Sequence, residues 1–391
     1  MRSVISSRKA AAAVAESLES RRHFDATIGG DVSVVMSGLD CPRGLAFDPR
    51  GALYVAEAGR GGGVGAPSVI QRGSTFYYGA TGAVSRLWKG VQEHVASGLP
   101  SLAMANGSRA EGPSDISFQG VGSGYVAIAL EGNPNLREQL GDVGTGFGRL
   151  VRMTPDGRCA PVADLAGYEA TVNPDGRQLD SDPYSVLAEP DHQIIVDAGG
   201  NSLVRVEANG EISTFAVLPT LATSTSGDAV PTCVTRGPDG AYYVGILTGL
   251  PFTNGAARIY RIVSGEAPVE FRTGFKAIID IDFDAAGNLF VLQHSSGATG
   301  LALPGSLLRV APDGTRTTVL SGLTNPTSVV VAPDGDLYVS EFGLSPGGGR
   351  VLRIATAPNS AVPFNVRNSS FAATTNLTFF GDLEEPEESL P

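Results

Sequence analysis

Short runs in which hydrophobic and polar residues alternate cover the chain from residue 31 to residue 357. Runs such as PTSVVV (326–331) and DLYVSE (336–341) have a period of two, which is typical of β-strands that bury one face. Tight-turn sequences such as DPRG (48–51) and APDG (332–335) separate the runs, and segments with a helical period are scarce. The pattern therefore predicts an all-β protein.

A unit of four short strands recurs along this region. Its first strand begins at Pro42, Pro113, Pro183, Pro231, Ile278 and Pro326, which makes six units. In each unit an LYV-like second strand follows, then a third strand with an arginine between apolar residues, and then a fourth strand with polar alternation. One such sheet cannot bury both of its faces, whereas six sheets stacked around an axis can. We therefore predict a six-bladed β-propeller of four-stranded antiparallel blades.

The last unit lacks its fourth strand, because the pattern stops after RVLRIA (350–355). A matching strand lies at the other end of the region. The sequence DVSVVMSGL (31–39) closely resembles TTVLSGL (317–323), the fourth strand of the fifth unit. We predict that residues 31–39 complete the last blade, which would pair the two ends of the domain and remove an open sheet edge.

These assignments divide the chain into three parts. Residues 31–357 form the propeller, and residues 1–30 are a leader that is a candidate export segment. Residues 358–391 end in the acidic sequence GDLEEPEESLP, which is typical of a disordered, solvated tail.

Charge and composition narrow the range of partners. A formal net charge of -12 excludes nucleic-acid binding, which requires clustered basic residues, and only three lysines are present. No apolar run is long enough for a transmembrane segment. The three cysteines, Cys41, Cys159 and Cys233, have neither zinc-site nor disulfide-framework spacing. An acidic surface suits a cationic or neutral ligand or a metal ion, or it serves only solubility.

Loop lengths indicate which face of the propeller is functional. The connections between first and second strands, and between third and fourth strands, are short turns. The extra length lies in the two other kinds of connection, which emerge together on the opposite face because antiparallel strands alternate in direction. They are the loops 58–80, 130–147 and 294–304 and the inter-blade links 100–112, 164–182 and 220–230. Long loops on a rigid scaffold usually carry binding sites, so we predict the ligand site there.

Acidic residues are predicted at the mouth of the channel on this face. Asp115 and Asp280 begin the innermost strands of opposite blades, and Glu57 and Glu341 end the second strands of neighbouring blades. Carboxylates around one axis repel each other unless a cation or protons intervene, so these four residues are candidate Ca²⁺ ligands. The alternative is that they accept backbone N–H hydrogen bonds or cap strand ends.

Other polar residues complete the predicted site. The segment 163–183 is predicted to form a short helix that places Asp180, Asp182 and Tyr184 over the channel, as ligand contacts or as turn caps. His294 is a candidate catalytic base beside Asp280, or simply a polar loop residue. The full set of candidate ligand-binding residues is Asp115, Asp180, Asp182, Tyr184, Asp197, Asn201 and Asp280.

Several segments resemble the ScyD/ScyE family of NHL-type propellers. They include GLDCPRGLAFDPRGALYVAEAGRGG (38–62), YEATVNPDG (168–176) and DSDPYSV (180–186), and the resemblance extends over residues 32–357. It implies a six-bladed propeller and an extracytoplasmic location, but no particular reaction. ESLESRRHFDA (16–26) resembles the LEPR-XLL segment of exported bacterial proteins. The alternative for this segment is a leader that carries no targeting signal.

Two functions fit these features. The first is a monomeric, exported binding or scaffold propeller without enzymatic activity, which holds a small molecule or a protein on its loop-rich face. The second is a Ca²⁺-dependent lactone or ester hydrolase, similar to gluconolactonase and regucalcin, that uses the channel carboxylates and His294. Calcium is the one cofactor that the sequence suggests.

Overall fold

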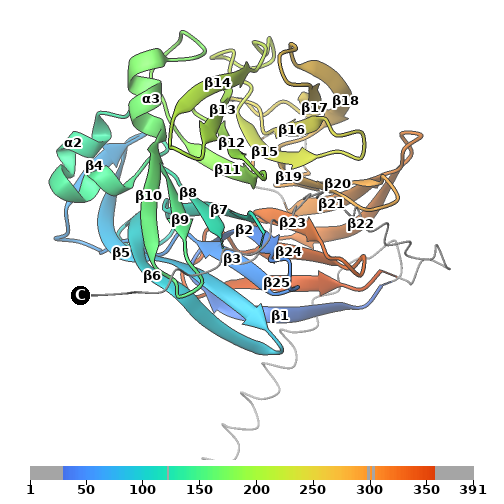
Figure 1. The fold of residues 1–391 in the computed structure, drawn as a ribbon, viewed down its shortest axis with the longest axis horizontal. Coiled ribbons are helices and arrows are strands. Elements are labelled where there is room, and N and C mark those ends of the chain that lie inside the picture. The colour runs from blue at the N-terminus through green and yellow to red at the C-terminus, as the bar shows by residue number, and fades with distance from the viewer. Residues whose placement is uncertain (1–29, 121–122, 297–299, 302–303, 357–391) are drawn as a thin grey trace, which may run out of the picture. The chain divides into compact units, whose positions relative to one another are not determined.

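Six antiparallel sheets lie around one axis in the computed structural model, which describes residues 30–120, 123–296, 300–301 and 304–356 (Figure 1). The predicted all-β, six-bladed propeller is confirmed. The predictions for the leader, up to residue 29, and for the tail, residues 358–391, lie outside the described residues.

Each blade runs outward from a strand beside the axis. The strands of the first three blades, from the innermost to the outermost, are β2 (Pro42–Phe47), β3 (Leu53–Glu57), β5 (Ser74–Trp88) and β6 (Val91–Ala103); β7 (Pro113–Phe118), β8 (Gly124–Ile128), β9 (Arg149–Met153) and β10 (Cys159–Asp164); and β11 (Pro183–Ala188), β12 (His192–Asp197), β13 (Ser202–Glu207) and β14 (Ile212–Val217). The order along the chain is therefore the order across each sheet.

The other three blades repeat this order, except for the last strand. Their strands are β15 (Pro231–Arg236), β16 (Tyr242–Ile246), β17 (Ala257–Ile262) and β18 (Val269–Phe275); β19 (Ile278–Phe283), β20 (Leu289–Gln293), β21 (Gly305–Val310) and β22 (Arg316–Leu323); and β23 (Ser328–Val331), β24 (Leu337–Glu341), β25 (Gly349–Ile354) and β1 (Val32–Leu39). The first strand of the chain thus belongs to the last blade.

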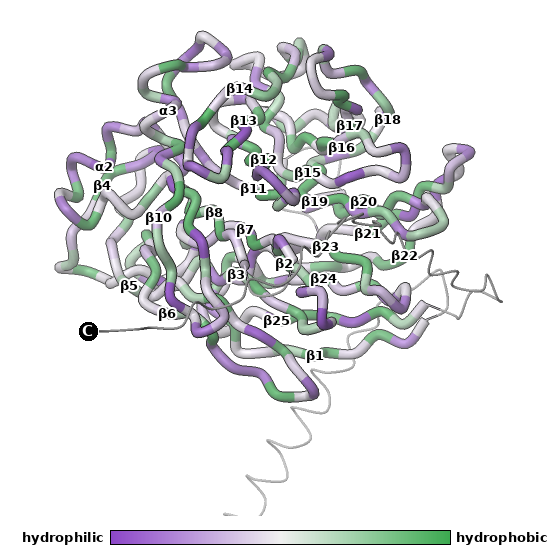
Figure 2. The backbone as a smooth tube through the Cα atoms, in the orientation of Figure 1, coloured by the Kyte–Doolittle hydropathy of each residue, from purple (hydrophilic) through white to green (hydrophobic). Residues whose placement is uncertain are grey.

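The hydrophobic core lies between neighbouring blades. The second strands β3, β8, β16 and β20 are buried at every position, because each blade packs on both of its faces. Figure 2 shows the corresponding hydropathy: hydrophobic stretches lie along the strands, and many connecting turns are hydrophilic. A rigid stack of this kind holds the loops at its two faces in fixed positions.

The ring closes through the N-terminal strand, as predicted. β1 pairs antiparallel with β25, with Val32 opposite Ile354 and Leu39 opposite Gly349 (Figure 1). Met36 and Leu39 on this strand are almost completely buried. The pairing covers the edge that β25 would otherwise expose.

Blade one differs from the prediction in having a fifth strand. The sequence predicts only a loop for residues 58–80, but β4 (Ser68–Gln71) pairs with the first four residues of β5. The two-residue turn between them is Arg72-Gly73, and both residues have positive φ, at 45° and 77°. These values suit a type I′ hairpin turn, whose twist matches that of the paired strands.

Short helices lie in the long connections. They are α2 (Leu136–Gln139), the 3₁₀ helix η1 (Gly141–Gly146) and α3 (Leu165–Val172). The third lies within the segment 163–183 that was predicted to be helical, and the Asp164 side chain caps it by accepting a hydrogen bond from the Gly167 N–H at 3.0 Å. None of the helices in the described part of the chain is long and apolar enough to cross a membrane.

Closure of the ring by β1 can be tested at two positions of this strand. Replacing buried Met36 with alanine should lower the free energy of unfolding by about 2–5 kcal/mol, because it leaves a cavity between blades. Val34→Ala is the matched control, since Val34 is 48% exposed on the same strand and should cost less than about 1 kcal/mol. Urea unfolding measures both values, and equal effects would contradict the closure.

Candidate functional site

A cavity of about 330 Å³ opens at the channel mouth on the loop-rich face. Its walls come from segments that follow second strands, such as Glu131 after β8 and His294 after β20. They also come from links that precede innermost strands, such as Glu111 before β7 and Asp182 before β11. The cavity therefore lies on the face for which the loop lengths predict the ligand site.

Charged side chains of both signs line this cavity. They are Arg43, Arg72, Arg109, Glu111, Glu131, Asp180, Asp182 and Asp228. Apolar side chains such as Leu247, Ile279 and Leu344 complete the walls. A site of this composition can fix the orientation of a polar ligand while it buries an apolar part.

Glu111 and Glu131 form a carboxyl pair in the cavity wall. Burial, followed by the neighbouring Glu131 carboxylate, raises the pKa of Glu111 well above its ordinary value. Burial also opposes the ionisation of Glu131, but the hydrogen bond from Glu111 and the guanidinium of Arg72 outweigh it and lower the pKa of Glu131. Arg72 reaches Glu131 from the tip of the β4–β5 hairpin. The pair is thus a neutral acid that donates to a carboxylate held by an arginine.

Asp180 and Asp182 lie beside this pair. Burial raises the pKa of Asp180 to about 6, although Arg72 opposes the shift. Burial and the carboxylates of Glu131 and Asp197 raise the pKa of Asp182 well above its ordinary value. The structure therefore brings these two predicted ligand-binding residues into the cavity, where they add to a group of carboxyls that hold protons more strongly than usual.

Backbone bridges fix both acidic segments. Glu111 pairs with Leu102 through two hydrogen bonds of 2.7 Å. Gly132, next to Glu131, pairs with Ser181, which lies between Asp180 and Asp182. The Gln71 side chain also donates to the Glu131 carbonyl at 3.1 Å, which ties the β4–β5 hairpin to the same wall. The carboxyls therefore come from segments whose backbone positions are fixed.

Tyr184 and His294 line the cavity too. Burial, opposed by Arg43, raises the pKa of the Tyr184 phenol, so this group is a neutral donor. Burial lowers the pKa of His294, whose Nδ1 lies 3.0 Å from the Pro326 carbonyl oxygen. The ring is therefore neutral and donates through Nδ1. In the described part of the chain, no hydrogen bond joins His294 to Asp280, the partner that the sequence predicted for a catalytic base.

Asp115 and Asp280 do not line the cavity. The Asp115 carboxylate accepts hydrogen bonds from the Ser185 hydroxyl and the Val186 N–H of the next blade, both at 2.8 Å. Asp280 accepts the equivalent bonds from Ser328 at 2.6 Å and Val329 at 2.8 Å. These contacts match the alternative in which the two acids accept backbone N–H bonds. Gly44 makes room for Asp115, since a Cβ there would lie 1.9 Å from its Oδ1.

Glu57 and Glu341 have equivalent contacts in neighbouring blades. Glu57 accepts hydrogen bonds from the Asp40 N–H at 2.6 Å and the Ser85 hydroxyl at 2.5 Å. Glu341 accepts from the Thr324 N–H at 2.9 Å and forms an ion pair with Arg350. Both carboxylates are buried and tie the end of a second strand to the link before an innermost strand. Within the residues described, no group of three His, Cys, Asp or Glu side chains is arranged to hold a metal ion.

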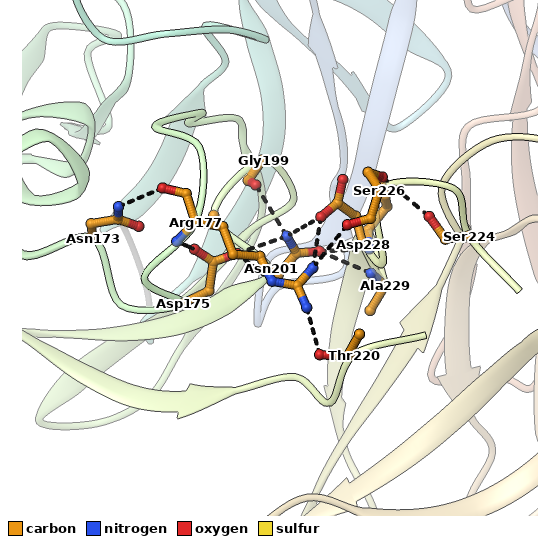
Figure 3. A network of polar contacts seen from close by, with 12 residues as sticks. Asn173, Asp175, Arg177, Gly199, Asn201, Thr220, Ser224, Ser226, Asp228 and Ala229 are labelled. Atoms are coloured by element: carbon orange, nitrogen blue, oxygen red, sulfur yellow. Dashed lines mark hydrogen bonds and ion pairs between the residues drawn. The ribbon is translucent and has the colours of Figure 1, made fainter. Parts of the chain in front are cut away.

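Asp197 and Asn201 hold loops in place next to the cavity. Asp197 accepts hydrogen bonds from the Asp182 N–H at 2.7 Å and the Ser181 hydroxyl at 2.8 Å. Figure 3 shows Asn201 at the centre of a polar network: its amide donates to Asp175 and Asp228, and its Oδ1 accepts from the Ala229 N–H at 2.9 Å. The polar side-chain groups of both residues thus form hydrogen bonds within the protein.

Sequence reasoning missed Glu111, Glu131 and the three arginines of the cavity. Glu111 stands two residues before Pro113, which begins the first strand of its blade. Glu131 lies shortly after the second strand of the same blade. Asp182 also lies just before the proline that begins a first strand. A comparison of the residues before each of these prolines would therefore have drawn attention to Glu111. Arg72 carried no such signal, because β4 has no counterpart in the repeat.

Comparisons with known proteins support the fold. No protein-family model matches the chain, and no curated protein matches it. Solved structures do match. One is a proposed oxidoreductase (glucose dehydrogenase) from Thermus thermophilus, with 17% identity, 84% of this chain and 100% of that chain covered, and a TM-score of 0.51. Another is a protein of unknown function from Bacteroides thetaiotaomicron, with 11% identity, 84% and 72% coverage, and a TM-score of 0.52.

Virginiamycin B lyase from Staphylococcus aureus, solved with quinupristin, is also similar, with 14% identity, 86% and 100% coverage, and a TM-score of 0.47. At these identities the likeness concerns the fold alone. The resemblance to the ScyD/ScyE family stays a prediction.

The raised pKa values predict how stability depends on pH. A carboxyl whose pKa is higher in the folded state than the ordinary value near 4 binds more protons when folded, so its contribution to stability falls as pH rises through that interval. Glu111→Gln cannot ionise and keeps a donor toward Glu131. We expect this variant to match the wild type at about pH 4 and below, and to be more stable by roughly 1–3 kcal/mol near pH 8.

Urea unfolding of both proteins across this pH range measures the difference. Glu138→Gln is the matched control, because Glu138 is exposed on α2 and does not line the cavity. A Glu111→Gln variant that is less stable than the wild type at high pH would contradict the assignment of a proton to Glu111.

Proposed function

We propose that the chain is a binding protein of the ScyD/ScyE type that is exported and holds a small molecule at the channel mouth of its propeller. The cavity is the observation that carries this proposal. It has the size of a small organic ligand, lies where long loops meet, and is lined by residues with buried carboxyl oxygens that the protein itself leaves without hydrogen-bond donors. The resemblance to the ScyD/ScyE family and the LEPR-XLL-like segment support the extracytoplasmic location.

The binding role follows from how the acidic residues are distributed. Asp115, Asp280, Glu57 and Glu341 use their carboxylates in hydrogen bonds that join strands and blades. Glu111, Asp180 and Asp182 instead line the cavity, and each has a buried carboxyl oxygen without a hydrogen-bond donor. Residues that hold the ring together are therefore separate from residues that are available to a ligand.

The Ca²⁺-dependent hydrolase is the second function that the sequence predicts. Its candidate ligands do not line the cavity, and a metal bound to Asp115 or Asp280 would have to replace hydrogen bonds between blades. His294 lines the cavity, but its Nδ1 is used by the Pro326 carbonyl. These contacts favour binding over hydrolysis.

Filling the cavity tests the proposal. Leu344 lines the cavity from the loop after β24, so Leu344→Trp should occupy space that a ligand needs. We expect members of a fragment library with neutral, anionic and cationic compounds to bind the wild type in ligand-observed NMR. Their signals should be lost or at least about tenfold weaker with Leu344→Trp.

Val269→Trp is the matched control, because Val269 is 62% exposed on β18 and lies outside the cavity. It should bind the same fragments as the wild type. If no fragment binds, or if Leu344→Trp binds them unchanged, this cavity is not a ligand site.

A further inference from the structure

Three carboxyl oxygens in the cavity wall lack a hydrogen-bond donor. They are Glu111 Oε2, Asp180 Oδ1 and Asp182 Oδ1, and each is buried with no N–H or hydroxyl donor among the described residues; the Glu111 carboxyl has only the Glu131 carboxylate as a partner. Glu111 as a whole residue is only 6% exposed. A buried, ionised oxygen without a donor is strongly unfavourable. Each oxygen must therefore take a proton or a donor that comes from outside the protein.

The basic residues of the cavity do not supply these donors. Arg72 forms an ion pair with Glu131, and Arg43 donates through Nη2 to the Ala110 carbonyl at 2.6 Å. Arg109 lies over the ring of Phe76, with 5.7 Å between its Cζ atom and the ring centroid. The guanidinium groups thus leave the three oxygens without partners.

Several charged groups determine the protonation of Glu111. Burial, and then Glu131 and Asp182, raise the pKa of Glu111, and Arg72 lowers it. The other titratable or charged groups around the cavity are Arg43, Arg109, Asp180, Tyr184, Asp228 and His294. Asp228 is paired with Arg177 at 2.9 Å, which reduces its effect on the cavity. The cavity therefore has more carboxyl groups than basic groups, and most of these carboxyl groups lie between blades two and three.

From these contacts we propose that the cavity binds an organic cation with N–H donors, a primary ammonium or a guanidinium, beside the Glu111, Asp180 and Asp182 carboxyls, and that the cation replaces the proton held by Glu111. The inference rests on the proposed function and adds the class of ligand. Before binding, Glu111 carries a proton, whereas Asp180, whose pKa is about 6, is largely ionised near neutral pH. On binding, the proton of Glu111 goes to the buffer, and the carboxylates accept hydrogen bonds from the N–H groups of the ligand.

The chemistry of the walls selects among cations. The unpartnered oxygens are acceptors, so a quaternary ammonium, which has no N–H, leaves them unsatisfied. A ligand with N–H groups forms charge-assisted hydrogen bonds with them. Leu247, Ile279 and Leu344 line the remaining walls, which suits a cation with an apolar body. Alkylammonium and alkylguanidinium ions are thus the simplest probes.

Calorimetry on the full chain tests the proposal. The probes are n-butylguanidinium and n-butylammonium, with n-butanol as a neutral analogue and tetramethylammonium as a cation without N–H. Each is titrated near neutral pH in two buffers with different ionisation enthalpies, which gives the number of protons exchanged. We expect at least one of the N–H cations to bind with release of roughly one proton, and we expect no comparable binding of the other two compounds.

Variants show whether the effect arises at Glu111. Glu111→Gln should weaken binding of the N–H cation by at least about tenfold and abolish most of the proton release, because it removes the charge but keeps the shape. Glu138→Gln, the charge-matched surface control, should leave both quantities unchanged. Proton release by the wild type is a separate measurement, so the proposal stays testable even if Glu111→Gln folds poorly.

Each other outcome has a distinct meaning. Equal binding of n-butanol or tetramethylammonium, or cation binding without proton release, overturns the proposal. Calcium chloride that binds with proton release and displaces the organic cation replaces it with a metal site. If neutral or anionic fragments bind the cavity and N–H cations do not, only this inference fails. If nothing binds there, the proposed function fails as well.

Discussion

Hydrogen bonds between the innermost strands of neighbouring blades are the interaction on which the rest of the structure depends. These strands meet without forming a common sheet, so side chains make the connections. Asp115 joins blade two to blade three, Asp280 joins blade five to blade six, and the Thr327 hydroxyl donates to the Pro42 carbonyl at 2.9 Å between blade six and blade one. The β1 strand completes the same ring at its outer edge. Because the ring is held together both near its axis and at its outer edge, it positions its loops rigidly.

This constraint explains why acidity near the axis does not by itself mark the ligand site. Asp115 and Asp280 accept hydrogen bonds from the next blade, and the buried carboxylates of Glu57 and Glu341 tie strand ends to the links before innermost strands. The inter-blade links are held by their own backbone bridges, such as the pairing of Glu111 with Leu102. Carboxyls on those links can face a cavity instead of a neighbouring strand, and there they hold protons that a ligand can replace.

Much of the architecture could be predicted from the sequence, because the blade is a local pattern repeated many times. The six blades, the closure by residues 31–39 and the helix within 163–183 all follow from periodicity, turns and the missing strand. The β4 strand could not be predicted, since it occurs in one blade only and depends on the Arg72-Gly73 turn. Among candidate site residues, Asp180, Asp182, Tyr184 and His294 do lie in the cavity.

The remaining features of the site needed three-dimensional information. Whether Asp115 faces the axis or the next blade depends on Ser185, which is 70 positions away in the chain. Likewise, Glu111, Glu131 and Arg72 come together only because blade one extends its β4–β5 hairpin over blade two. Local patterns carry no signal for such contacts, so sequence reasoning found the correct face of the propeller but only part of its cavity.

In the cavity, the Glu111 carboxyl keeps its proton until a cation replaces it. Carbon NMR of glutamate-labelled protein, with the Glu111 carboxyl assigned by comparison with Glu111→Gln, measures this directly. We expect Glu111 to titrate well above its ordinary pKa in the free protein and at distinctly lower pH when n-butylguanidinium is bound. Titration near the ordinary value of about 4.3 in both states would contradict it.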